Sequence, residues 1–150
     1  MKIKLLTIFV LALSLMSCRN ETQINNSNTT EAEEVTVDKS TKLSLDNGKK
    51  WLANKETHIG IKNMDSLIEA FTANNAKNYF ELGEALSKQT SYVIKNCTMK
   101  GESHNQLHVV LVPMLDEISV LKDTTDSEER KKIIKNLQKL IEIYFQHFKT

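Results

Sequence analysis

Four stretches between residues 57 and 149 carry apolar side chains at intervals of three and four residues, the period of an α-helix with one buried face. The first two apolar stripes are formed by Ile61, Met64, Leu67, Ile68 and Phe71, and by Tyr79, Leu82, Leu86, Val93 and Cys97. The third stripe is formed by His104, His108, Leu111, Leu115 and Ile118, flanked by Leu107, Met114 and Leu121. The fourth is formed by Ile133, Ile134, Leu137, Leu140, Ile141, Tyr144 and Phe148. A chain with this pattern has to bury four helical faces against one another.

The short connections and the composition narrow the architecture further. None of the connections exceeds about eight residues, which favours antiparallel neighbours. Four glycines and one proline in 150 residues are too few for an all-β chain, because such a chain needs many tight turns. The sequence therefore predicts an all-α domain over residues 51–150, an antiparallel up-down-up-down four-helix bundle.

Local signals predict where the helices begin and end. We expect the first helix to begin near residues 57–58, and Gly101 to follow the end of the second. Ser103 is a suitable N-cap for the third helix, and residues 125–128 read as a capping box for the fourth. Pro113 lies inside the third helix and removes one backbone hydrogen bond, so we expect a kink there.

The first 18 residues have the pattern of a targeting segment. Lys2 and Lys4 precede an apolar run of 11 residues, Leu5–Leu15, whereas a membrane-spanning helix needs about 20. This charge and length are typical of a signal peptide. The run ends in Leu15-Met16-Ser17-Cys18, which resembles the lipobox of bacterial lipoprotein precursors.

The resemblance implies a signal peptide over residues 1–17, cleavage before Cys18, a diacylglycerol on the Cys18 thiol and a palmitate-like acyl chain on the new amino terminus. Two or three acyl chains anchor a protein stably in a lipid bilayer. Arg19 stands where an aspartate would imply retention in the inner membrane, so the resemblance implies the outer membrane, with the protein facing the periplasm or the cell surface. The alternative is an ordinary secreted protein in which Cys18 follows the cleavage site.

A polar segment joins the anchor to the helices. Residues 18–50 are rich in asparagine, threonine and glutamate and contain few apolar side chains. Such a segment buries too little apolar surface to offset the entropy of ordering it, so we expect a flexible tether. Asp46-Asn47-Gly48 is a turn signal near its end.

Charge and motifs exclude several classes of function. A formal net charge of +1 does not suit a nucleic-acid-binding protein, which needs an excess of basic residues. The chain has no phosphate-binding loop, no nucleophile elbow and no HExxH motif. We therefore expect a protein that is not an enzyme, although a catalytic dyad of Cys97 with His104 is a distant alternative.

The predicted topology brings the four histidines and Cys97 to one end of the bundle. His104 and His108 are one helical turn apart, and the turn before them returns the chain toward Cys97. A thiolate, two imidazoles and the thioether of Met99 form a set of ligands that suits Cu(I), with Zn(II) as the competitor. Two further ligands are available at the same end, His58 and His147.

Two other interpretations of this end are a satisfied polar cluster and a haem site. The histidines and Cys97 could form a polar cluster satisfied by hydrogen bonds, in a structural lipoprotein that interacts with an envelope protein partner. Haem is disfavoured, because the chain has no CxxCH motif and no pair of axial ligands stands out. The stretch from Cys97 to His108, in its bundle context, is also similar to small helical lipoproteins of bacterial envelopes that have no settled activity.

Overall fold

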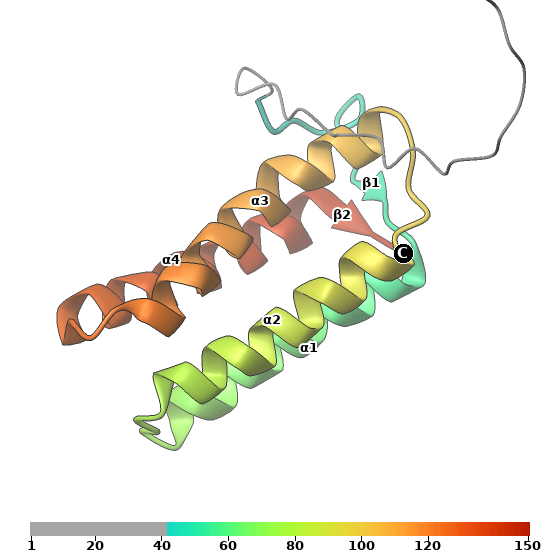
Figure 1. Cartoon of the computed structure of the whole chain (residues 1–150). Helices are drawn as coiled ribbons and strands as arrows, with labels where there is room; N and C mark the ends of the chain where they lie inside the picture. Colours follow the sequence, from blue (N-terminus) through green and yellow to red (C-terminus); the bar gives the residue numbers. More distant parts are fainter. Residues whose placement is uncertain (1–41) are drawn as a thin grey trace, which may run out of the picture. The chain divides into compact units, whose positions relative to one another are not determined.

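The structure, a computed structural model, describes residues 42–150 (Figure 1). Four helices make up most of this part of the chain: α1 (Lys55–Ala73), α2 (Tyr79–Asn96), α3 (Glu102–Asp123) and α4 (Ser127–His147). A short strand precedes them, β1 (Trp51–Leu52), and another follows, β2 (Phe148–Lys149). The prediction of an all-α fold with four helices is confirmed. The predicted signal peptide, Cys18 and most of the predicted tether lie outside the described residues.

The four helices share one hydrophobic core. Each helix packs against the next along the chain, and α1 also packs against α4. The largest fully buried side chains come from all four helices and from β2, among them Ile68, Leu86, Met114, Leu137 and Phe148. Burying one side chain of this size contributes roughly 1.5–3 kcal/mol relative to leaving it in water. No helix in residues 42–150 combines the length and the hydropathy needed to cross a membrane.

The buried stripe of α3 differs from the one that the sequence pattern suggested. Its buried residues are Gln106, Leu107, Val110, Leu111, Met114, Ile118 and Leu121. His104 and His108 are only half-buried, so the prediction that they lie on the core stripe is wrong. The larger apolar side chains take the centre, while the imidazoles, which need polar partners for both ring nitrogens, lie at the edge of the core. The helix continues through Pro113 as one element.

The helix starts also differ from the predicted ones. The residue before α3 is Gly101, whose φ of +62° favours glycine, and not Ser103, whose hydroxyl donates to the carbonyl of Lys100. The N-cap of α4 is Asp126 and not Thr125, because the Asp126 carboxylate accepts hydrogen bonds from two backbone N–H groups of the first turn. A charged acceptor at a helix start also interacts favourably with the helix dipole.

The chain enters the bundle along an ordered path. Asp46 and Lys49 exchange two backbone hydrogen bonds of 2.8 Å across the predicted turn. Trp51 then pairs with Phe148 in the parallel contact of β1 with β2, which the sequence pattern did not predict. Further upstream, the side chain of Gln106 accepts a hydrogen bond of 2.8 Å from the backbone N–H of Ser44. The last part of the range assigned to a tether, residues 42–50, therefore lies against the helices.

Candidate functional site

The candidate site begins with the turn between α2 and α3. Cys97 is the residue after α2 and has an extended backbone, and Gly101 then redirects the chain into α3. As a result the first turn of α3 returns His104 to Cys97, and the thiol sulfur lies 3.6 Å from Nδ1 of the imidazole. At this distance the thiol donates a weak hydrogen bond to an unprotonated Nδ1, or a protonated Nδ1 donates to a thiolate. The sequence prediction that these two side chains meet agrees with this geometry.

His108 extends the pair into what we call the thiol–imidazole cluster, Cys97, His104 and His108. The ring centroids of the two histidines are 4.3 Å apart, with an angle of 62° between the ring planes. Both side chains are half-buried. Burial lowers the pKa of His108, and the neighbouring His104 lowers it further. The neutral imidazole, the form that binds metal ions, is therefore favoured at His108.

Tyr144 lies near His58 and Cys97, and the sequence pattern did not identify it as a candidate site residue. Its side chain is fully buried, and its hydroxyl lies 3.4 Å from Nδ1 of His58. Burial raises the pKa of Tyr144 well above its usual range, and the proximity of Cys97 adds to the rise. The hydroxyl therefore stays protonated and links the start of α1 to the end of α4. Its position in the apolar stripe of α4 identified it only as a core residue.

The other proposed ligands have different surroundings. Burial lowers the pKa of His58, and its ring packs edge-on against Phe145 at a centroid distance of 5.5 Å. Nδ1 of His147 lies 2.8 Å from the backbone carbonyl of Ile143, four residues earlier in α4. Met99 is half-buried against the hydrophobic core. Among the described residues, no hydrogen bond or ring contact joins these three side chains directly to the thiol–imidazole cluster.

The arrangement as it stands places two donor atoms close together. Within residues 42–150, no group of three histidine, cysteine, aspartate or glutamate side chains is arranged to hold a metal ion. The predicted set of Cys97, His104, His108 and Met99 is thus represented by one close pair, Cys97 with His104, and by an adjacent imidazole, His108. Chemically, such a pair can share a proton or bind one metal ion between sulfur and nitrogen.

Comparison of the chain with family models, with curated proteins and with solved structures finds no match to any of them.

Proposed function

We propose that this protein is a lipoprotein of the bacterial cell envelope that binds a soft metal ion, Cu(I) or Zn(II), through Cys97 and His104. Acyl chains on Cys18 anchor it in the outer membrane, and the polar segment after Cys18 separates the anchor from the bundle. The protein acts as a binding protein and not as an enzyme. The observation that carries the proposal is the distance of 3.6 Å between the Cys97 sulfur and Nδ1 of His104.

That distance suits two ligands of one metal ion. A zinc–sulfur bond of about 2.3 Å and a zinc–nitrogen bond of about 2.0–2.1 Å, at an angle of about 110–120°, separate the two donor atoms by about 3.6–3.8 Å. The observed separation therefore requires little movement of Cys97 or His104 on binding. A site that is already formed loses less free energy to ordering when its ligand arrives.

The small number of close ligands favours copper over zinc. A structural zinc site has four protein ligands, whereas Cu(I) is satisfied by three, and thiolate, thioether and imidazole ligands suit both ions. Rotation of the half-buried His108 would add a nitrogen ligand, and Met99, two residues after Cys97, would add a thioether. We therefore expect the protein to bind Cu(I) more tightly than Zn(II).

The arrangement of helices that this proposal uses is an antiparallel up-down-up-down bundle. Two contacts between distant residues support it. The side chain of Asn54, just before α1, donates to the carbonyl of Asn96 at the end of α2, at 3.0 Å. His58, in the first turn of α1, lies beside Tyr144 near the end of α4. The short connections between the helices favour the same arrangement.

Competitive titration of the full chain with Cu(I) tests the proposal. The chain, purified in a neutral detergent, would compete for Cu(I) with a coloured chelator, and Zn(II) would be titrated in parallel. We expect Cys97→Ser and His104→Gln each to weaken Cu(I) binding by at least about tenfold, because each removes one ligand. His147→Gln is the matched control, since Nδ1 of His147 contacts a backbone carbonyl, and we expect a change of less than about twofold.

Two outcomes would overturn the metal-binding proposal. One is a chain that does not compete for either ion. The other is a Cys97→Ser variant with the affinity of the unsubstituted chain. A Cys18→Ser variant measures any contribution of the other cysteine to metal binding.

Mass spectrometry of the mature amino terminus tests the lipid anchor separately. We expect an amino terminus at residue 18 that carries acyl chains, and an unmodified Cys18 would contradict the proposed anchor.

The second candidate function is that of a structural or interaction lipoprotein in which no metal binds. The same 3.6 Å contact favours it, because a hydrogen bond gives the Cys97 thiol and Nδ1 of His104 a partner without a metal ion. Three exposed apolar side chains, Ile59, Tyr92 and Ile94, provide apolar surface on α1 and α2 for a partner protein. This function predicts that Cys97→Ser lowers the midpoint of thermal unfolding while the chain binds neither Cu(I) nor Zn(II).

A further inference from the structure

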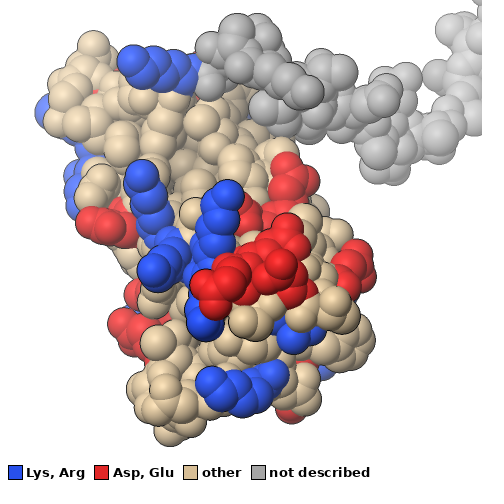
Figure 2. All heavy atoms as spheres, turned by 90° about the vertical axis from the view of Figure 1, so that its left-hand side faces the viewer, with Lys and Arg blue, Asp and Glu red and all other residues tan. Residues whose placement is uncertain are grey.

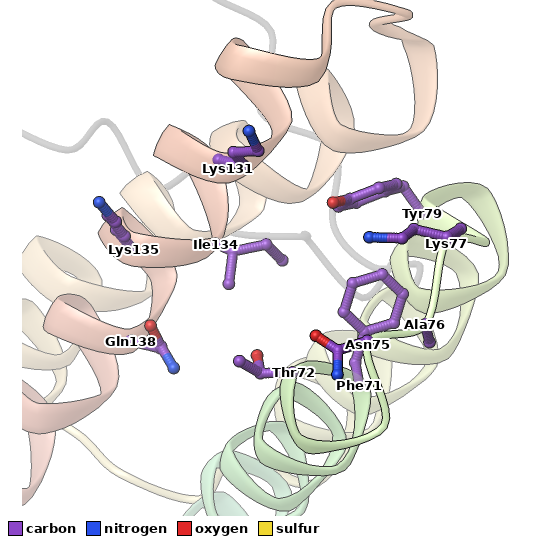
Figure 3. Close-up of a pocket in the computed structure, with 10 residues that line it drawn as sticks. All are labelled: Phe71, Thr72, Asn75, Ala76, Lys77, Tyr79, Lys131, Ile134, Lys135 and Gln138. Atoms are coloured by element: carbon purple, nitrogen blue, oxygen red, sulfur yellow. The ribbon is translucent and has the colours of Figure 1, made fainter.

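A cavity lies between α4 and the connection from α1 to α2 (Figure 3). Its volume is about 250 Å³. The last turn of α1 contributes Phe71, the start of α2 contributes Tyr79, and α4 contributes Ile134. None of its lining residues belongs to the thiol–imidazole cluster, so the two sites are separate.

The walls of this cavity are apolar and partly fixed. The rings of Phe71 and Tyr79 meet edge to face at a centroid distance of 4.9 Å. The guanidinium of Arg130 also lies over the Tyr79 ring, 5.1 Å from the ring centroid. These contacts hold the aromatic ring in place, which gives a planar apolar molecule a preformed surface to pack against.

The rim of the cavity is basic. Lys77, Lys131 and Lys135 all line it, but Lys131 is paired with Glu128 at 2.7 Å. Within residues 42–150, neither Lys77 nor Lys135 has an ion pair with a carboxylate. In Figure 3 the amine of Lys77 and the hydroxyl of Tyr79 both extend across the cavity toward α4, whereas the amine of Lys135 points away from the cavity. The unpaired ammonium group of Lys77 at an apolar cavity favours a ligand with a negative charge.

The basic rim is a local feature and not part of a large basic surface. Figure 2 shows basic and acidic side chains next to each other on the face that carries the helix connections on the left of Figure 1. A surface of mixed sign attracts no polyanion such as a nucleic acid. The charge of this cavity therefore selects a small anion rather than a macromolecule.

We propose that this cavity binds a small organic carboxylate with a planar apolar body. A cavity of about 150 Å³ can hold a benzene molecule. The 250 Å³ available here therefore accommodates one aromatic ring together with a carboxylate. The ring packs between Phe71 and Ile134, and the carboxylate lies toward Lys77 and the Tyr79 hydroxyl.

Fluorine NMR of a fluorinated ligand tests this assignment. The full chain in a neutral detergent at low salt would be titrated with 4-fluorobenzoate, and with 4-fluorobenzyl alcohol as the uncharged analogue. We expect the carboxylate to bind and the alcohol to bind at least about threefold more weakly, because the alcohol lacks the charge. The variant Lys77→Met should weaken carboxylate binding by about threefold.

Lys139→Met is the matched control, because Lys139 is an exposed lysine of α4 that does not line the cavity. It should leave the affinity for 4-fluorobenzoate unchanged. The proposal is overturned if 4-fluorobenzoate does not bind. It is equally overturned if Lys77→Met binds it as the unsubstituted chain does, or if the alcohol binds as tightly as the carboxylate.

Discussion

Replacing Gly60 by alanine tests how closely α1 and α2 pack. A Cβ atom added at Gly60 would lie 2.3 Å from Cγ2 of Val93, a side chain that is fully buried. A Cβ atom added at Gly83, in α2, would lie 2.4 Å from Cγ of Lys122, a side chain that is 29% exposed. The two overlaps are nearly equal, but only Lys122 can turn into solvent to relieve its overlap. The same substitution should therefore have different effects at the two glycines.

The expected magnitudes follow from two opposing effects. Alanine is favoured over glycine inside a helix by about 0.8–1 kcal/mol. Overpacking a core costs about 1–3 kcal/mol, so Gly60→Ala should lower the free energy of unfolding by about 0–2 kcal/mol. Gly83→Ala costs at most the exposed ion pair of Lys122 with Glu84, about 0–1 kcal/mol, so it should leave stability unchanged or raise it slightly. The helix-propensity gain is common to both variants, so we expect Gly60→Ala to be less stable than Gly83→Ala by up to about 3 kcal/mol.

Urea unfolding of the full chain, followed by circular dichroism and by the fluorescence of Trp51, measures this difference. Trp51 is the only tryptophan, and it lies in the strand that pairs with β2. Adding Val93→Ala to the Gly60→Ala variant should remove the overlap and give a coupling free energy of at least about 1 kcal/mol. The proposed close packing of Gly60 against Val93 is refuted if Gly60→Ala is as stable as Gly83→Ala, or if Gly60 and Val93 show no coupling.

Two further predictions concern the N-cap of α4 and the hydrogen bond between Gln106 and Ser44. Hydrogen bonds from the backbone N–H groups of Glu129 and Glu128 hold the pKa of Asp126 below its ordinary value. The Asp126 carboxylate therefore stabilises the fold fully above the pKa of Asp126 in the unfolded chain, and this stabilisation is lost as the pH falls through the pKa of Asp126 in the folded chain. The difference in urea midpoint between the unsubstituted chain and Asp126→Ala should therefore be larger at pH 7 than at about pH 2.5, and equal differences would contradict it. Gln106→Leu should lower the free energy of unfolding by about 1–2 kcal/mol, because the backbone N–H of Ser44 loses its partner. Hydrogen exchange at Ser44 should become faster in that variant, and unchanged exchange would argue against this role.

The helices of this protein could be predicted because their apolar periodicity is long and regular. Leu82, Leu86 and Val93 share one face of α2 by spacing alone, and all three are buried. In α3 the predicted apolar stripe is centred on the wrong residues, because it includes His104 and His108, which are not among the buried residues of the helix. The sequence pattern does not report which of two adjacent stripes faces the core when both have helical spacing.

Short elements, and contacts between residues far apart in the sequence, were harder to predict. The pairing of Trp51 with Phe148 joins strands of two residues, which are too short to show any periodicity. The proximity of Cys97 to His104 was predictable, because only a short turn separates them in the sequence. The contact of Tyr144 with His58 was not, because it depends on how α1 and α4 pack at the end of the bundle.

X-ray absorption of the copper-loaded full chain is the sharpest test of metal binding by Cys97 and His104, because it identifies the atoms bound to the metal. If Cys97 and His104 bind one Cu(I) ion, the spectrum should contain one sulfur neighbour at about 2.2–2.3 Å and at least one imidazole nitrogen at about 2.0 Å. The sulfur shell should weaken or disappear in Cys97→Ser. A spectrum with no sulfur neighbour, or one that Cys97→Ser leaves unchanged, would contradict the proposed site.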